Sequence, residues 1–381
     1  MNYSDRHYKR IWPLLQMIFR GYVTRKFNMT FEELNVDGPV LLIPNHVTSW
    51  DPLLVGMSIR KKQTYYVASE HLFRKGFRSE LLKWVAGPIP ITKGSVSTDT
   101  VRICLRHLKA GNSICIFAEG EQSWDGRNHK VHESTGKLAK LSGATLVTYR
   151  IEGGYLSKPR WADTIRTGRI HGHPVGIYSP EELKSKSPAE IQEIINRDIS
   201  ENAWERQLED PVEYKGERLA EGLERALYLC PGCRKTGTLR TSGDRISCSC
   251  GLNIRYRTDG FFEPDTPFRD IADWEDWQKQ ALRSGKFEHG AELFSDEGIS
   301  LKKVGDDHTD IPIEEGRIIQ YPDRLVLGDH CFPLDEIDYM AMTRTHILLF
   351  STGGTYYQFS SEPGVNFRKY LEIWKAQSKE Q

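Results

Sequence analysis

Two short apolar runs in the first third of the chain each lead directly into a cluster of polar residues. Residues 40–43 precede Asn45-His46-Val-Thr-Ser-Trp-Asp51, and residues 114–117 precede Glu119-Gly120. A short apolar run of this kind predicts a strand buried on both faces, as in the sheets of α/β proteins. Because open α/β sheets bind ligands beyond the carboxyl ends of their strands, both polar clusters mark a candidate site.

Further elements alternate around these two runs. The hydrophobic spacing predicts a strand and three helices, at residues 64–68, 78–85, 97–109 and 132–141. The last two helices are followed by Gly111 and Gly143, which suit helix ends. Ser187-Pro-Ala-Glu190 is a capping box with proline at the first helical position, and it predicts a long polar helix to about residue 208. The alternation indicates an α/β domain that this helix closes.

His46 is the side chain in these clusters best suited to move a proton. A histidine with an unperturbed pKa titrates near neutrality, so it can accept a proton from a hydroxyl and release it in a later step. Asp51 follows at an interval that lets it turn back and hold the other ring nitrogen, which fixes the tautomer and stabilises the imidazolium. His330-Cys-Phe-Pro-Leu-Asp335 repeats the interval without a Glu-Gly cluster downstream, so the spacing alone does not define such a pair.

A third cluster, Gly87-Pro-Ile-Pro-Ile-Thr-Lys93, lies between the first two, and the last one extends as Phe117-Ala-Glu-Gly-Glu-Gln-Ser123. In these three ordered blocks the chain resembles the lysophosphatidic acid acyltransferase family of glycerolipid acyltransferases, over roughly residues 30 to 175. The resemblance implies that His46 is the general base and Asp51 its orienting partner. It also implies an acceptor-binding site that contains Lys93, Glu119, Gly120, Gln122 and Ser123.

The chain departs from the family pattern at the position of Gln122. The family has an arginine there, which can grip a phosphate with two parallel hydrogen bonds, so a phosphate-bearing acceptor is in question. In the fourth block, Arg150 follows the apolar run from Leu146 and adds a charge that can compensate for Gln122. Structural alternatives are a histidine satisfied at a strand end, a Glu119 carboxylate that serves a helix dipole, and a solvated Lys93.

Composition narrows the class of protein. With 381 residues, of which 38% are hydrophobic, the chain can bury a sizeable core in two or three domains. The formal net charge is zero, so no global field favours nucleic acid as a partner. The seven cysteines fit a reducing compartment better than a disulfide framework.

The N-terminal segment predicts an amphipathic helix at a membrane surface. Apolar side chains recur at helical spacing from Ile11 to Tyr22, Trp12 and Phe19 flank them, and six basic residues up to residue 30 oppose Asp5 alone. Such a stripe suits an anionic lipid surface, whereas no run approaches the roughly 18 apolar residues of a spanning helix. A helix packed on its own domain is the alternative. With no secretory signal, we expect a peripheral or monotopic protein on the cytoplasmic face of the cell membrane.

Four cysteines in the second half form two closely spaced pairs. Cys230-Pro-Gly-Cys233 and Cys248-Ser-Cys250 flank a polar stretch, which predicts a zinc ribbon with four thiolates in tetrahedral coordination. Because four thiolates leave no open coordination position, we expect a structural zinc and no catalytic metal. Residues 226–260 carry six basic and two acidic side chains, which keeps nucleic-acid binding open, but they lack the interleaving of aromatic and basic residues suited to base stacking.

The last third of the chain is predicted to be rich in β-strands. After a short helix around Trp274 and Trp277, β-prone runs alternate with turn residues from 292 to 360, and a terminal helix carries Tyr370 and Trp374 on one face. Strands followed by a terminal helix resemble pleckstrin-homology-like domains. This is a fold analogy and assigns no ligand.

Taken together, the patterns predict an interfacial segment at 1–30, an acyltransferase domain at 31–215, a zinc ribbon at 216–262 and a β-rich domain at 263–381. The resemblance implies transfer of an acyl chain from acyl-CoA or acyl carrier protein to the hydroxyl of 1-acylglycerol 3-phosphate, in phospholipid biosynthesis. Alternatives are another lysolipid or glycolipid acceptor, a non-catalytic lipid or membrane adaptor, and a nucleic-acid binder acting through the ribbon, which the composition disfavours.

Overall fold

The computed structural model describes most of the chain and divides it into two compact units. It describes residues 5–59, 64–69, 80–81, 83–84, 87–91, 98–264, 266–284, 291–305, 309–361 and 365–377. The first unit comprises Met1–Arg160 and Thr164–Gly216, and the second comprises Trp161–Asp163 and Glu217–Gln381.

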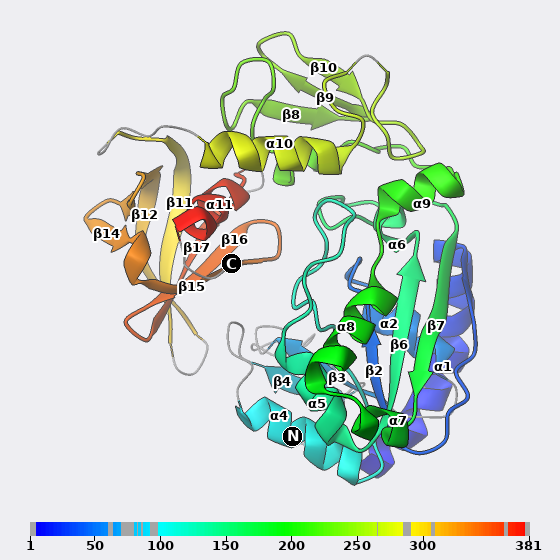
Figure 1. Cartoon of the computed structure of the whole chain (residues 1–381). Helices are drawn as coiled ribbons and strands as arrows, with labels where there is room; N and C mark the ends of the chain where they lie inside the picture. Colours follow the sequence, from blue (N-terminus) through cyan, green and yellow to red (C-terminus); the bar gives the residue numbers. More distant parts are fainter. Residues whose placement is uncertain are drawn as a thin grey trace. The chain divides into compact units, whose positions relative to one another are not determined.

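A seven-stranded sheet forms the centre of the first unit (Figure 1). Its order is β1-β7-β6-β2-β5-β3-β4, with β6 and β7 antiparallel and every other neighbouring pair parallel. The strands are β1 Met29–Phe31, β2 Val40–Pro44, β3 Thr64–Ser69, β4 Ile89–Ile91, β5 Ser113–Cys115, β6 Thr145–Glu152 and β7 Ile170–Tyr178. The first apolar run therefore lies in β2 and the second begins in β5, and these two strands are adjacent and parallel.

Helices flank this sheet on both faces. They are α1 Asp5–Phe27, α2 Asp51–Ser58, α4 Thr98–Lys109, α5 Ser134–Ser142, α6 Gly154–Ser157, α7 Pro180–Ser185, α8 Pro188–Ile199 and α9 Ala203–Glu209. Leu41 and Ile43 of β2 share a buried cluster with Ile191 and Ile195 of α8, which crosses in front of the strands in Figure 1. On α2, the Ser58 hydroxyl contacts the Tyr149 hydroxyl of β6. The predicted α/β class is confirmed.

The long helix predicted from residue 188 to about 208 is instead two helices. α8 ends at Ile199, and Asn202 starts α9 by accepting a hydrogen bond from the Trp204 amide at 3.1 Å. Between the two helices, the chain pairs with residues 126–128, through Asn128 N–H to the Glu201 carbonyl and Ala203 N–H to the Gly126 carbonyl. Helical periodicity does not depend on such a tertiary pairing, so the break leaves no local signal in the sequence.

Helix α1 is longer than the predicted stripe and contains Pro13 well inside it. Proline removes one backbone donor and would by itself weaken the turns before it. Those turns are held by side chains on the domain-facing side: Trp12 packs beside Gly56, and the Tyr8 hydroxyl donates to the Lys83 carbonyl. Tertiary contacts therefore keep the helix continuous through the proline.

The second unit contains a small three-stranded sheet and a larger antiparallel one (Figure 1). The small sheet has the order β10-β9-β8, from β8 Leu239–Ser242, β9 Arg245–Cys248 and β10 Asn253–Arg255, after the short helix η2 Leu223–Arg225. Helix α10, Ile271–Arg283, follows as predicted. Its Trp274 indole donates to the Leu229 carbonyl, so α10 packs on the segment that leads into the cysteine pairs.

The larger sheet has seven antiparallel strands in the order β14-β13-β12-β11-β17-β16-β15. They are β11 Phe294–Val304, β12 Asp310–Gln320, β13 Arg324–Leu327, β14 His330–Pro333, β15 Ile337–Thr343, β16 Ile347–Thr352 and β17 Thr355–Ser361, with η3 Leu334–Glu336 before β15. Helix α11, Arg368–Gln377, buries Phe367 at its start, Tyr370 and Trp374. The predicted β-rich C-terminal region with a terminal helix is confirmed.

Candidate functional site

The first polar cluster leaves the sheet at the carboxyl end of β2 and is locked there by Asn45. This side chain is fully buried, its amide donates to the Ile151 carbonyl at 3.1 Å, and its carbonyl accepts from the Ile151 amide at 2.7 Å. Asn45 thus imitates a peptide group and continues the pairing with β6 by one residue. The chain turns away immediately afterwards, which puts His46 at the sheet edge.

His46 and Asp51 form a hydrogen-bonded pair, with 2.8 Å between Nδ1 and Oδ2. The same carboxylate oxygen accepts the amides of Val47 at 2.7 Å and Thr48 at 2.9 Å, so the five-residue interval closes into a compact turn at the start of α2. Asp51 is fully buried, and the His46 side chain is 17% exposed. A carboxylate at Nδ1 favours the proton there, which leaves the lone pair on Nε2. The imidazole also stacks on Phe117, with 4.4 Å between ring centroids.

Glu119 holds the loop of His46 in place. Its Oε1 accepts the His46 amide and the Asn128 side-chain amide, each at 2.7 Å, and its Oε2 accepts the His129 amide at 2.7 Å. Burial, with a smaller contribution from the nearby charge of Asp51, raises the pKa of Glu119 to about 8 against the lowering effect of these three hydrogen bonds. The structure therefore gives Glu119 three protein partners.

The other predicted residues of this block follow in the same loop. Gly120 has φ of +71°, a conformation that favours glycine. Ser123 is buried, and its amide donates to the His46 carbonyl at 3.1 Å. The backbone carbonyl oxygen of Gln122 lies 3.4 Å from Arg160 Nη1. His46, Asp51, Glu119, Gly120, Gln122 and Ser123 are thus gathered around two adjacent strand ends.

Arg160 was not identified in the sequence analysis, although it brings a guanidinium to this loop. Its Nη1 lies 2.6 Å from Glu121 Oε1, and its guanidinium lies 4.2 Å from the centroid of the Trp124 ring. Its side chain is only 9% exposed. It lies 37 positions after Ser123 and outside the motif blocks, and no local sequence pattern identifies it as part of the site.

Two predicted acceptor residues have a different outcome. Lys93 lies outside the described residues. Arg150 donates from Nε and Nη2 to the Asp198 carbonyl, at 3.1 and 2.7 Å, near the C-terminal end of α8. A cation at this end of a helix interacts favourably with the exposed carbonyls, so Arg150 has a structural role there.

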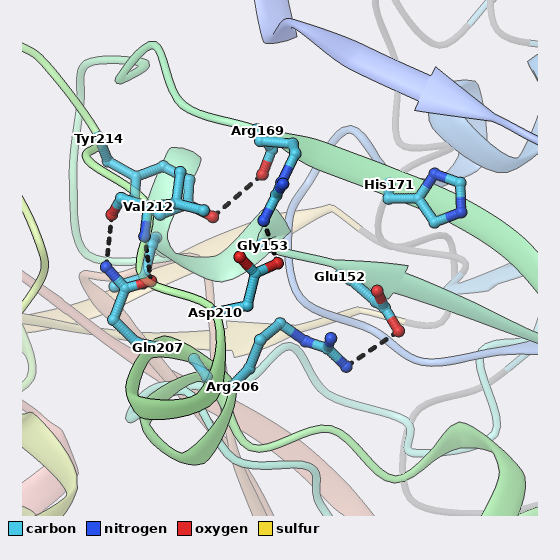
Figure 2. Close-up of a pocket in the computed structure, with 11 residues that line it drawn as sticks. Glu152, Gly153, Arg169, His171, Arg206, Gln207, Asp210, Val212 and Tyr214 are labelled. Carbon is cyan, nitrogen blue, oxygen red and sulfur yellow. Dashed lines mark hydrogen bonds and ion pairs between the residues drawn. The ribbon is translucent and has the colours of Figure 1, made fainter.

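A small cavity lies at the end of β6, between β7 and α9 (Figure 2). Arg206 pairs with Glu152 at 2.9 Å and with Glu201 at 2.6 Å, and Arg169 pairs with Asp210. The guanidinium groups that reach this cavity thus have carboxylate partners. These ion pairs join α9 to the sheet.

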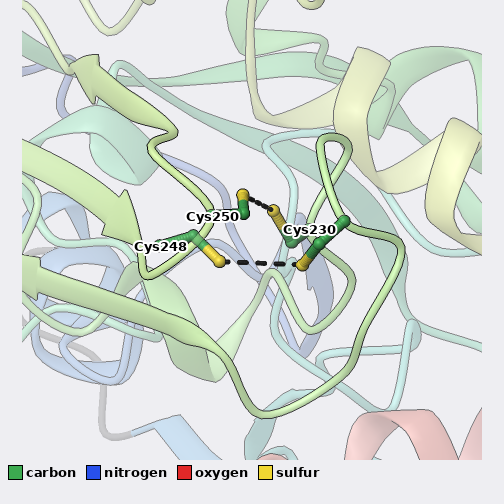
Figure 3. Close-up of side chains that lie close together, drawn as sticks. Cys230, Cys248 and Cys250 are labelled. Atoms are coloured by element: carbon green, nitrogen blue, oxygen red, sulfur yellow. Dashed lines mark hydrogen bonds between the residues drawn. The ribbon is translucent and has the colours of Figure 1, made fainter.

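The four cysteines of the predicted ribbon converge. Cys230 Sγ lies 3.6 Å from Cys250 Sγ, Cys233 Sγ lies 3.7 Å from Cys248 Sγ, and all four sulfurs lie within 4.8 Å of one another. Figure 3 shows the side chains of Cys230, Cys248 and Cys250 close together, with a dashed line that joins the sulfur atoms of Cys230 and Cys250. These separations far exceed the S–S bond of a disulfide, which is about 2.05 Å. The cluster can therefore hold a metal ion.

Helix α1 exposes apolar side chains on its outer side. Leu14, Met17 and Ile18 are 58, 72 and 63% exposed, and Phe19 and Tyr22 are also exposed. Most of the predicted stripe faces outward, whereas Trp12, expected beside it, is buried against the domain. Among the described residues, no helix has the length and hydropathy needed to span a membrane.

Comparison with known proteins found a family model and solved structures that are similar to part of this chain. Residues 26–152 match the family model described as Acyltransferase. The crystal structure of the 1-acyl-sn-glycerophosphate (LPA) acyltransferase PlsC from Thermotoga maritima is similar with a TM-score of 0.42 and 16% sequence identity, over 52% of this chain and 83% of that chain. The matched family segment contains β2, the His46–Asp51 pair and the Glu119 loop. Residues 26–152 of this chain are therefore similar to the acyltransferase family.

Proposed function

We propose that the protein is a membrane-associated O-acyltransferase that moves an acyl chain from a thioester to the hydroxyl of a lysophospholipid. The observation that carries the proposal is the 2.8 Å contact between His46 Nδ1 and Asp51 Oδ2 at the end of a buried strand. The family of residues 26–152 supplies the reaction class. Acyl-CoA or acyl carrier protein is the proposed donor, and 1-acylglycerol 3-phosphate is the proposed acceptor.

In the proposed reaction, His46 Nε2 takes the proton of the acceptor hydroxyl as the oxygen attacks the thioester carbonyl. Asp51 stabilises the positive charge that the imidazole gains, and it holds the ring in the tautomer with a free Nε2. Collapse of the tetrahedral intermediate breaks the C–S bond, and His46 returns the proton to the leaving thiolate. The products are the ester and the free thiol.

The acceptor headgroup is a finer proposal. Gln122 offers neutral donors, and Arg160 reaches this loop already paired with Glu121. Such a neutral arrangement discriminates less strongly for a phosphomonoester than a free arginine does. A different lysolipid or a glycolipid is therefore the second candidate acceptor, in the same reaction.

Membrane association is proposed from α1. Its exposed Leu14, Met17 and Ile18 can enter the headgroup region, while Arg25 and Lys26 in the last turn can attract anionic lipid. The buried Trp12 and Phe27 fix the other side of the helix to the domain. This arrangement favours a peripheral or monotopic protein on the cytoplasmic face of the membrane.

The four-cysteine cluster is proposed to hold a structural zinc ion. With Zn–S bonds of about 2.3 Å, tetrahedral coordination separates the sulfurs by roughly 3.8 Å, and the shortest contacts here are 3.6 and 3.7 Å. Cys230, Cys233, Cys248 and Cys250 would supply all four ligands. Zinc bound there would cross-link the ribbon and leave the acyl transfer to the first unit.

The test is release of thiol from an acyl thioester in the presence of a panel of lysolipids, with mass spectrometry of the lipids formed. General-base assistance typically contributes about 10²- to 10⁴-fold, so His46→Ala should reduce transfer at least about a hundredfold. His330→Ala is the matched control, because His330 lies in β14 and faces Glu314 instead. Equal rates in wild type and His46→Ala would refute the proposal.

A further inference from the structure

Asn128 lies between the His46 loop and the start of α9, and its side chain bonds to both. Its Nδ2 donates to Glu119 Oε1 at 2.7 Å, and that same oxygen accepts the His46 amide at 2.7 Å. Its Oδ1 accepts the Glu201 amide. One planar amide thus uses a donor toward one segment and its acceptor toward another.

The far end of this connection is rigidly held. The Glu201 carboxylate receives two bonds from Arg206, from Nε at 2.6 Å and from Nη2 at 2.8 Å. Arg206 also contacts Glu152 at the end of β6, as Figure 2 shows. Arg206 of α9 is thus tied both to the sheet and to the segment that Asn128 grips. Asn128 is therefore anchored to a part of the domain that cannot shift independently of the sheet.

We infer that Asn128 is a positioning residue for the proposed acyl transfer, which holds the Glu119 carboxylate against the backbone of His46. It does so without touching the imidazole. Glu119 needs acceptor capacity for three N–H donors, from His46, Asn128 and His129, and an ionised carboxylate supplies it best. Loss of Asn128 removes one of the three N–H donors that favour the ionised form of Glu119. It also removes a bond that keeps Glu119 Oε1 beside the His46 amide.

The proton on Glu119 makes this role measurable. Burial places the pKa of Glu119 at about 8, and its bond to Asn128 acts in the opposite direction by favouring the ionised form. Removing that bond raises the pKa further, so at a given pH more of the protein carries a protonated Glu119. Asp51 of α2 is the charged group that acts on Glu119, and two of its hydrogen-bond donors are the backbone amides of titratable residues, His46 and His129. Activity lost in Asn128→Ala should therefore return in part as the pH rises.

The sharpest variant is Asn128→Asp, which keeps an oxygen for the Glu201 amide but sets a carboxylate against Glu119. Asn202→Asp is the matched control: it makes the same chemical change at the start of α9, where aspartate caps a helix as well as asparagine does. We expect Asn128→Asp to lower kcat ten- to hundredfold at neutral pH with little change in acceptor KM. Asn202→Asp should behave as wild type.

A second readout does not depend on catalysis. Amide hydrogen exchange of residues 45–48, followed by mass spectrometry, should accelerate in Asn128→Asp and not in Asn202→Asp. If Asn128→Asp unfolds at the assay temperature, Asn128→Ala replaces it in the test. The midpoint of its curve of activity against pH should then lie at a higher pH than that of the wild type. If the wild-type protein showed no acyl transfer, the proposed function would be refuted. The hydrogen-exchange measurement would still test whether Asn128 holds the His46 loop in place.

Two results would overturn the inference. Unchanged kcat together with unchanged exchange at residues 45–48 would show that Asn128 does not position the His46 loop. A rise confined to acceptor KM would show instead that Asn128 contacts the substrate directly.

Discussion

Replacing Asp51 by asparagine separates the chemistry of the His46–Asp51 pair from its contribution to folding. Asp51 Oδ2 accepts three N–H groups, from His46 at 2.8 Å, Val47 at 2.7 Å and Thr48 at 2.9 Å. An asparagine oxygen in the same position can accept all three, but without the negative charge. Geometry is therefore retained while the electrostatic support for a protonated imidazole is lost.

The magnitudes for stability and catalysis differ in this variant. A hydrogen bond to a charged group contributes about 1.5–3 kcal/mol, against about 0.5–1.5 kcal/mol for a neutral one, so three bonds lose roughly 3 kcal/mol together. Because Asp51 is fully buried, removing its charge also relieves a desolvation cost of several kcal/mol. We expect the two to offset, so that the free energy of unfolding changes by no more than about 2 kcal/mol. The imidazolium has no such offset, and a loss of about 3 kcal/mol there corresponds to roughly a hundredfold in rate.

The assay is thiol release from an acyl thioester with a lysolipid acceptor, together with thermal unfolding of the same preparation. Asp125→Asn is the matched control, because Asp125 is also buried, belongs to the same unit and is paired with Arg127 at 2.5 Å. We expect Asp51→Asn to lose at least about a hundredfold in kcat with a Tm close to wild type. Wild-type kcat in Asp51→Asn would refute the assigned role of Asp51.

Three further predictions concern the metal, the membrane and the acceptor. Purified protein should contain one zinc per chain, and stringent chelation should increase amide exchange at residues 226–262 while acyl transfer persists; elemental analysis that finds no metal would contradict the ribbon assignment. Glutamate at Leu14, Met17 and Ile18 should sharply reduce sedimentation with anionic vesicles, whereas glutamate at the exposed Leu141 and Leu208 should not; equal binding would exclude α1 as the contact. The side chains that recognise the headgroup should be revealed by kcat/KM for lysophosphatidic acid and for an uncharged monoacylglycerol, compared in Lys93→Gln, Arg150→Gln, Arg160→Gln and Gln122→Arg. A preference for the phosphorylated acceptor that none of these substitutions alters would exclude all four side chains from headgroup recognition.

Much of the candidate site could be predicted because its key pieces are local in sequence. Asn45 to Asp51 forms one turn after β2, and its hydrogen bonds span three to five residues. The four cysteines are similarly accessible to sequence reasoning, because thiolate pairs at short spacing have few other purposes. Apolar runs predicted the strands β2, β3 and β5, and helical periodicity predicted the helices α4, α5, α10 and α11.

Other features depend on contacts between distant segments and leave no local pattern. Arg150 looked like a spare cation beside the site, yet its guanidinium is taken by the Asp198 carbonyl, 48 residues away. Trp12 is of a residue type that is common at membrane surfaces, but the small Gly56 lets its ring pack against α2. In both cases the side chain is suited to two roles, and only the packing partner decides between them.

The break between α8 and α9 connects these two kinds of outcome. A continuous helix would satisfy the periodicity of residues 188–208, but it would keep the Glu201 amide inside the helix. The observed break releases that amide to Asn128, which in turn holds Glu119 against the His46 loop. The local preference for helix is therefore overridden at the place where the end of the domain supports the His46–Asp51 pair. A site predicted from strand ends alone contains the groups proposed to transfer the proton. It omits the segment around Glu201, 73 residues beyond Asn128, that helps to hold those groups in position.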